Sequence, residues 1–162
     1  MTYNINLQHR RGVKVLRTDN TGNAIRQNIG NSIITVNGST IAYTPLEGSS
    51  YVIYEFVSQF QERYNYNNAI FMLRMGDTSS SLSSIVSNDV GYKIKIGSGS
   101  TSPGENIRYR QQLNLRFAIP TSGWTSEKYV GLRTKCSPYS GLATESRING
   151  YSFSPFVIIY CI

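Results

Sequence analysis

The chain has few charged side chains, one histidine and two cysteines, and each shortage excludes a class of protein. Charged residues make up 15% of the 162 residues, against about 25% in a typical domain. The histidine, His9, has no carboxylate near it in sequence that would orient it as a general base. Two cysteines and one histidine do not complete a structural zinc site. We therefore expect no enzyme, no metal site and no cofactor.

Long apolar stretches are missing as well. No run approaches the ~20 residues of a membrane helix, and the N-terminus lacks the apolar core of a signal peptide. We expect a protein that neither enters a membrane nor is exported by that route. Cys136 and Cys161 are expected to be free thiols, which suits synthesis in a reducing cytoplasm.

The nine carboxylates offer no pair suited to catalysis. Glu55 and Glu62 differ in parity within one predicted strand, so they face opposite sides of it. Asp77 and Asp89 flank a Ser-rich connection, but their spacing fits no calcium loop. An enzyme, such as a polysaccharide-degrading esterase, therefore has the least support from the sequence.

Positive charge is concentrated near the N-terminus. The formal net charge is +7, and residues 1–30 hold five basic residues against one acid, Asp19. A dedicated nucleic-acid binder carries its basic face across the whole domain. Farther along, Arg108, Arg110 and Arg116 share one face of a predicted strand whose aromatic residues lie on the other face. Because single-stranded nucleic-acid sites mix the two kinds on one face, we expect no nucleic-acid partner.

Alternation with a period of two is abundant. Between Ile107 and Ile119, apolar residues fill nearly every odd position, and basic or amide residues fill nearly every even one. Residues 51–61 alternate in the same way. Period two over this length predicts strands and excludes helices. Shorter strands are predicted over residues 13–17, 69–75, 92–96 and 129–133.

Turn formers separate the predicted strands. Asn37-Gly38-Ser39 lies between the β-rich runs 32–36 and 40–44, and Asn-Gly in that position predicts a hairpin. Connections rich in Ser and Gly follow at residues 77–88 and 97–104. About eight to ten strands without a helix predict an all-β protein built as an antiparallel sandwich or barrel.

The C-terminal run from Phe156 to Ile162 carries no charge and no turn former. Such a short apolar run predicts a strand that is buried on both faces. Chain ends usually fray because few contacts repay the entropy of ordering them. We therefore expect this end to be covered by the chain's own sheets or by other subunits.

Four of these features together resemble the trimeric jelly-roll modules of virions. They are the basic N-terminal segment, the Asn-Gly turn, the run Tyr51-Val-Ile-Tyr-Glu-Phe and the closing apolar strand. Such modules occur as capsid decoration (cement) proteins and fibre heads of tailed bacteriophages, and their fold is similar to that of TNF and C1q-like trimers. The resemblance implies an antiparallel jelly-roll β-sandwich over residues 31–162, preceded by an extended basic N-terminal arm with a short strand over residues 1–30.

On this resemblance, the chain is a viral structural protein on the capsid surface, made in the host cytoplasm, whose arm bridges and stabilises capsomers. Its partners are then the major capsid protein and further copies of itself in a homotrimer. The predicted capsid-binding residues are the basic residues of the arm, Arg10, Arg11, Lys14, Arg17 and Arg26. The predicted oligomer interface joins one residue of the long strand to four of the C-terminal run, Tyr54, Phe156, Ile158, Tyr160 and Ile162.

The resemblance leaves a second function open, the receptor- or glycan-binding head of a phage head or tail fibre. Aromatic side chains in polar loops stack on sugar rings or on proteins, and the candidates here are Tyr64, Tyr66 and Trp124. The chain shows neither a collagen-like nor a heptad stalk before the module. This favours a module that sits directly on a shell.

Overall fold

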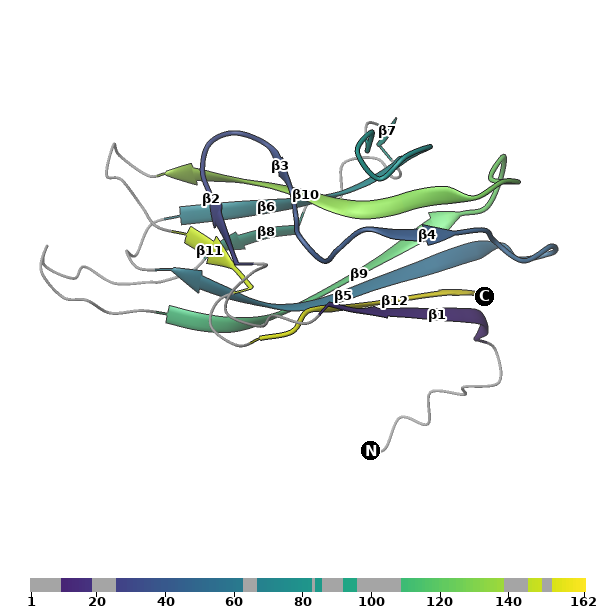
Figure 1. Ribbon diagram of the computed structural model, residues 1–162, viewed down its shortest axis with the longest axis horizontal. Helices are drawn as coiled ribbons and strands as arrows, with labels where there is room; N and C mark the ends of the chain where they lie inside the picture. Colours follow the sequence, from purple (N-terminus) through teal and green to yellow (C-terminus); the bar gives the residue numbers. More distant parts are fainter. Residues whose placement is uncertain are drawn as a thin grey trace, which may run out of the picture.

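The computed structural model describes residues 10–18, 26–62, 67–82, 84–85, 92–95, 109–138, 146–149 and 153–162. In these residues the chain forms strands and turns and no helix, which confirms the all-β class. Figure 1 shows two antiparallel sheets that face each other. The sheets hold eight strand positions, and four of these are each filled by two short strands placed end to end, which gives twelve strands.

The first sheet is built on the long pair of β5 (Tyr51–Glu62) and β9 (Tyr109–Pro120), which match residue for residue along their whole length. The other edge of β5 holds β12 (Phe156–Cys161) and, farther along, β11 (Ser146–Ile148). Outside them lie β1 (Arg11–Arg17), which pairs with β12, and β2 (Gln27–Ile29), which pairs with β11. The strand order is therefore β1-β12-β5-β9, with β2-β11 at one end.

The second sheet is built on the pair of β10 (Lys128–Pro138) and β6 (Asn67–Gly76). The free edge of β10 holds β3 (Ile34–Thr35) and β4 (Ile41–Tyr43). The free edge of β6 holds β7 (Ser84–Ile85) and β8 (Tyr92–Lys95). The order is β4-β10-β6-β8, with β3 and β7 in line with β4 and β8.

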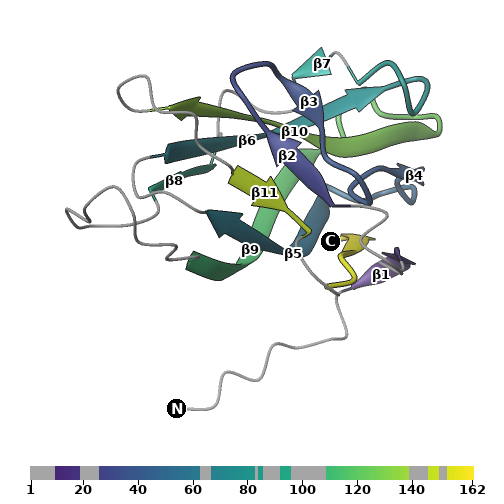
Figure 2. The ribbon, with the colours of Figure 1, turned by 60° about the vertical axis from the view of Figure 1, so that its left-hand side comes forward.

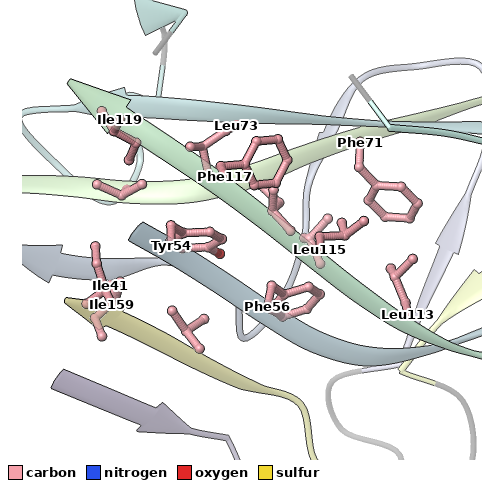
Figure 3. Packing of buried hydrophobic residues seen from close by; sticks show 14 of the residues in the cluster. Ile41, Tyr54, Phe56, Phe71, Leu73, Leu113, Leu115, Phe117, Ile119 and Ile159 are labelled. Atoms are coloured by element: carbon pink, nitrogen blue, oxygen red, sulfur yellow. The ribbon is translucent and has the colours of Figure 1, made fainter. Parts of the chain in front are cut away.

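The core lies between the two sheets. Alternate residues of β9, from Leu113 to Ile119, are at most 5% exposed, as their period of two predicts. They pack against aromatic side chains of β5 and β6, and Figure 3 shows Tyr54 and Phe56 from one sheet facing Phe71 and Leu73 from the other. Edge-to-face ring contacts such as those of Tyr54 with Phe117 add about 0.5–1.5 kcal/mol beyond area burial.

The C-terminal run forms a strand, as predicted, between β1 and β5. Val157 and Ile159 face the core and are fully buried. The opposite face is not uniformly covered, because Phe156 and Ile158 stay half-exposed while Tyr160 is 1% exposed. The prediction of burial on both faces thus holds for only part of the strand.

The prediction of a hairpin at Asn37-Gly38-Ser39 is wrong. The flanking strands β3 and β4 do not pair with each other; both pair with β10, and six steps from Thr35 to Ile41 match three along β10. A type I′ hairpin turn needs positive φ at both central residues, but only Gly38 has it here (φ 74°). Ser39 fixes the extra residues between β3 and β4 against β10. Its hydroxyl donates to the Val36 carbonyl at 2.7 Å and accepts from the Leu132 N–H at 3.0 Å.

Two strands of the predicted N-terminal arm belong to the first sheet. β1 lies beside β12 and β2 lies beside β11, so each extends the sheet by one position. Beyond β2, the Cys136 N–H donates to the Gly30 carbonyl at 2.8 Å, which connects this end of the first sheet to β10 of the second. The alternating residues Tyr3, Ile5 and Leu7 lie outside the described part of the chain.

Candidate functional site

The candidate site is the edge of the first sheet formed by β1, together with the outer face of β12, β5 and β9 beside it. Figure 2 shows β1 outside β12, at the end of the row of strands. Its three basic residues Arg11, Lys14 and Arg17 are exposed. Val13 and Val15, between them, are 53% and 59% exposed. β1 is therefore a basic edge strand with apolar side chains open to solvent.

Hydrogen bonds between β1 and β4 of the second sheet hold β1 in place. The Lys14 ammonium donates to the Ala42 carbonyl at 2.8 Å, and the Tyr43 hydroxyl donates to the Gly12 carbonyl at 2.7 Å. A Cβ on Gly12 would lie 3.0 Å from the Tyr43 hydroxyl and 3.1 Å from Leu46, and its φ is +59°. A glycine is therefore required where the bulge between Arg11 and Lys14 brings β1 against β4.

A polar cluster covers the outer face next to β1. The Arg10 guanidinium lies 4.5 Å from the centre of the Tyr160 ring. The Tyr160 hydroxyl donates to a Glu55 carboxylate oxygen at 2.8 Å and accepts from Arg116 at 3.2 Å. Arg116 also forms an ion pair with Glu55, whose N–O distance is 3.3 Å. Glu55 is thus engaged from two directions, as a surface ion pair and not as a catalytic acid.

The pKa of Tyr160 is raised by this environment. Burial is the largest cause, and the hydrogen bond to Glu55 and the charge of that carboxylate raise the pKa further, because a phenolate beside a carboxylate is unfavourable. The positive charges of Arg116 and Arg10 lower it in part. Tyr160 therefore acts as a neutral hydrogen-bond donor that holds Glu55 and carries Arg10 on its ring.

The five predicted capsid-binding residues do not form one patch. Arg10, Arg11, Lys14 and Arg17 lie in or beside β1. Arg26 immediately precedes β2, at the far end of the same sheet edge. Two of the four at β1 also have structural contacts, since Lys14 bonds to β4 and Arg10 covers Tyr160. Arg11 and Arg17 are left as the side chains best placed to reach a partner.

The predicted interface residues lie at three different depths. Tyr54 is fully buried inside the single chain, where its hydroxyl donates to the Ser39 carbonyl. It has no surface to offer another copy, so we exclude it from the interface. Phe156 and Ile158 are half-exposed on the outer face of the first sheet, and Ile162 is 44% exposed. Tyr160 reaches the same outer face but is covered by the cluster described above.

The predicted receptor-binding residues are not brought together either. Trp124 is 5% exposed; its indole N–H donates to the Ser126 carbonyl at 2.9 Å, and its ring packs edge-on against Tyr43. It is a core residue and not an open stacking platform. Two hollows flank it, one lined by residues 45–49 with Thr121 and Thr125, the other by residues 119, 120, 122 and 123 with Met75 and Lys128. Tyr64 and Tyr66 lie outside the described residues.

Other chemistry is sparse in the described part of the chain. It contains no group of three or more His, Cys, Asp or Glu placed to hold a metal, and no helix long and apolar enough to cross a membrane. Asp77, considered as a calcium ligand, forms an ion pair with Lys128. Cys136 and Cys161 are buried thiols that form no disulfide. His9 lies outside the described residues.

Val13 and Val15 are the surface residues that the sequence reasoning missed. Both belong to the predicted strand 13–17, but its short run of valines and a leucine suggests burial. The signal that identifies an edge strand is the mixture: basic residues at Arg11, Lys14 and Arg17 interrupt the apolar ones at both parities. Inward- and edge-placed charges are typical of strands that lack a second neighbour.

Solved structures match this fold, whereas sequence comparisons do not find relatives. No protein-family model matches the chain, and no curated protein matches it. The chain is similar to VP2 of infectious bursal disease virus in a subviral particle, with a TM-score of 0.51 and 13% identity over 91% of this chain and 32% of that one. It is also similar to the structure of the Gx strain of that virus, with a TM-score of 0.51 and 12% identity over 92% of this chain and 36% of that one.

These matches concern the fold alone. At 12% and 13% identity, no individual residue of the site can be transferred from one chain to the other. The chain spans about a third of the length of the matched proteins. The common element is a β-sandwich that, in both matched structures, belongs to a virus.

Proposed function

We propose that the chain is a structural protein of a virus particle, and more specifically a decoration (cement) protein on the outside of a capsid that bridges neighbouring capsomers. The observation that carries this proposal is the fold shared with VP2 in a subviral particle over 91% of this chain. The site chemistry agrees with it, since the described residues there hold an ion pair, hydrogen bonds and an exposed edge strand.

The order of strands supports a jelly-roll topology. The two sheets read β1-β12-β5-β9 and β4-β10-β6-β8, so strands adjacent in a sheet are mostly distant in sequence. Double-sheet jelly rolls have eight strand positions and two interlocked Greek keys. In this arrangement strands close to either end of the chain, β1 and β12, lie side by side.

Basic residues at β1 would attach the protein to the capsid. Arg11 and Arg17 are exposed there, and an acidic shell surface would attract them. A protein that binds only the assembled shell stabilises it by mass action, by about 2.7 kcal/mol per site when its free concentration is a hundred times the dissociation constant. Bridging two capsomers from one bound module would multiply this effect.

The proposed assembly is a homotrimer. Phe156, Ile158 and Ile162 supply exposed or half-exposed apolar surface along β12, and Val57 lies half-exposed opposite Phe156 on β5. A surface of this kind is what a module that packs against its own copies needs. Sedimentation equilibrium tests it directly: a mass of three chains is expected, and a monomer at micromolar concentration would contradict it.

Cosedimentation with purified virus particles tests the capsid-binding role. Arg17→Glu is expected to weaken binding by about tenfold or more, since it reverses one exposed charge at the proposed contact. Lys135→Glu on β10, in the other sheet, changes the net charge equally and serves as the matched control. No binding of the unmodified protein would contradict the capsid-binding role, and equal binding of both variants would contradict the assignment of β1 as the contact.

A large N-terminal deletion is a poor test of the same idea. Removing residues 1–28 deletes β1 and most of β2. The edges of β12 and β11, with which these strands pair, would then be exposed. Loss of capsid binding would then be inseparable from a damaged sheet. Removing residues 1–9 leaves β1 intact and isolates the part of the arm that precedes it.

The receptor- or glycan-binding head is the second candidate, and the two hollows beside Trp124 favour it. Their rims carry hydroxyls of Ser122 and Thr125, both exposed. Ser122→Arg and Thr125→Arg would fill the hollows without touching the core. Loss of glycan-array binding or cell adsorption in these variants would support a fibre head, whereas a decoration protein predicts no change.

A further inference from the structure

The backbone of β1 has one edge without a partner strand in the described part of the chain. The residues whose N–H and C=O groups point to that edge can be identified. The Thr18 N–H donates to the Pro155 carbonyl at 3.0 Å, so Thr18 points toward β12. In an antiparallel ladder, successive residues point their N–H and C=O groups to opposite sides. Leu16 therefore also points toward β12, and Val15 and Arg17 point their backbone groups outward.

Both outward-pointing residues are exposed. Val15 is 59% exposed and Arg17 is exposed, so a strand laid beside β1 would meet no covering side chain. Hydrogen bonds hold β1 in its place in the sheet, because Lys14 bonds to Ala42 and Gly12 bonds to Tyr43. A partner would extend the sheet and would not replace β1.

Charge decides which partner fits. Two copies of β1 placed side by side would set Arg11, Lys14 and Arg17 of one copy against the same residues of the other. Like charges directly opposite each other destabilise a strand pair. β1 itself contains no acid, and Glu55, on the same face two strands away, is engaged by Arg116 and Tyr160. Self-pairing is therefore disfavoured, while an acidic strand gains from the same charges.

We propose that the outer edge of β1 binds an extended acidic segment of another protein, which adds to the first sheet as a further strand. The side chain next to Val15 would be apolar, and the one next to Arg17 would be a carboxylate. Backbone bonds supply affinity and the alternate side chains supply selectivity in this mode of recognition. If the protein acts as proposed above, the segment belongs to a protein of the viral shell; only this identification of the source rests on the proposed function.

Two synthetic peptides test this without any virus. One is a ten-residue peptide in which Val and Glu follow each other at every second position, with Thr between them, so that Val and Glu share one face. The other replaces every Glu with Lys. The first peptide is expected to bind and the second is not, as measured by fluorescence anisotropy of labelled peptide. Binding is also expected to weaken as salt screens the charges. Equal binding of both peptides, or of neither, would overturn the proposal.

Amide hydrogen exchange locates the contact. With the Glu-Val peptide at saturation, the Val15 and Arg17 amides are expected to exchange at least roughly tenfold more slowly, because they gain a partner. The Leu16 amide already bonds toward β12 and is expected to change by less than about twofold. Protection of Leu16 alone, or protection of Val15 and Arg17 that rises with protein concentration in the absence of peptide, would contradict the assignment. The latter result would identify a second copy as the occupant.

Substitutions separate backbone from charge. Val15→Pro removes an N–H that does not pair with β12, and proline is tolerated on an edge where its missing N–H faces solvent. This variant is expected to fold and to lose peptide binding, whereas Leu16→Pro, its matched control, is expected to lose stability. Arg17→Glu is expected to reverse the preference between the two peptides. It needs no change to the backbone, so it tests the proposal even if Val15→Pro does not fold.

The outcomes separate this inference from the proposed function. Peptide binding at β1 together with no affinity for virus particles would leave the acidic-strand site standing and remove the decoration role. Capsid binding that is insensitive to Val15→Pro and Arg17→Glu would leave the decoration role standing and remove the acidic-strand site at β1 as its contact.

Discussion

β1 and β12 are neighbours in one sheet, yet they are held there by different forces. β12 has a strand on either side and buries Val157 and Ile159 completely in the core. β1 has β12 on one side only, and two of its apolar side chains, Val13 and Val15, are more than half exposed. What keeps β1 in place is its backbone ladder, the partly buried Leu16 side chain and a few polar contacts, such as that of Lys14 with Ala42.

The difference separates stability from recognition. Burial of apolar surface contributes about 25 cal/mol per Å², so a strand like β12 carries much of the free energy of folding. A strand like β1 contributes little of it, which leaves its residues open to selection for binding. Changes in β12 should therefore reduce the stability of the protein, and changes on the outer side of β1 should reduce binding and spare the fold.

The largest predicted effect is that of Ile159→Ala. Its side chain is fully buried, and removing it leaves a cavity that costs about 3 to 4 kcal/mol of unfolding free energy. Val15→Ala, on the neighbouring strand, is expected to cost less than about 0.5 kcal/mol. Urea unfolding followed by circular dichroism measures both. Similar losses for the two variants would break the contrast between the strands.

Alkaline pH is expected to give the next effect. The pKa of Tyr54 is raised by burial, and burial also raises that of Tyr43, with Cys161 adding to the shift. A raised pKa in the folded state means that stability is constant below the unfolded value of about 10 and falls above it, by about 1.4 kcal/mol per pH unit for each such tyrosine. Phenolate absorbance and unfolding should rise together. A titration of all tyrosines near pH 10 without unfolding would contradict this.

A smaller effect is expected from Tyr160→Phe. The change removes the hydrogen bonds with Glu55 and Arg116 but keeps the ring beneath Arg10. We expect a loss of about 1 to 2 kcal/mol, because one bond goes to a charged carboxylate. Tyr51→Phe, at a position that is 45% exposed, is the control and should change stability little. Thermal unfolding of the two variants side by side measures the difference.

The smallest effect belongs to Arg10→Ala. Arginine over an exposed aromatic ring contributes about 0.5–1 kcal/mol, and more where the pair is desolvated. The variant should lose about this amount and bare the Tyr160 ring, which near-ultraviolet circular dichroism would register. Arg10→Lys retains a cation and should lose less. A loss larger than that of Tyr160→Phe would show that Arg10 also anchors β1.

Much of the framework could be predicted from the sequence because it is written in local patterns. β9 and β5 alternate over their whole lengths, and the apolar run at Phe156 has no other plausible conformation. These strands appear within a few residues of where the periodicity places them. The free, buried state of Cys161 follows from the same apolar run.

The turn at Asn37 shows where local patterns stop. Asn-Gly predicts a tight turn, and one is present, but the chain does not reverse there. β3 and β4 run in the same direction and both pair with β10, which is far away in sequence. Nothing within the turn itself says that the chain will resume along the same strand. The hydrogen bond from Leu132 to Ser39 settles it, and that contact exists only in the folded protein.

The surroundings of Trp124 and Arg10 could not be predicted from the sequence for a related reason. A tryptophan among Ser, Thr and Gly reads as an exposed loop residue, yet the loop folds its ring against Tyr43. An arginine in a basic segment reads as a partner contact, yet it finds an aromatic ring on the chain's own C-terminal strand. Both depend on the joining of segments from opposite ends of the chain.

The pairing of β1 with β12 also orders events during synthesis. Chains emerge from the ribosome N-terminal end first, at about 5–20 residues per second. β1 is therefore made early but has no ladder to join until β12 emerges, after almost all the rest of the chain. During that interval the exposed valines of β1 lie beside Arg11, Lys14 and Arg17. Repulsion between these charges on neighbouring nascent copies would disfavour pairing of one β1 with another. The same charges that suit an acidic partner in the finished protein would thus guard the unfinished one.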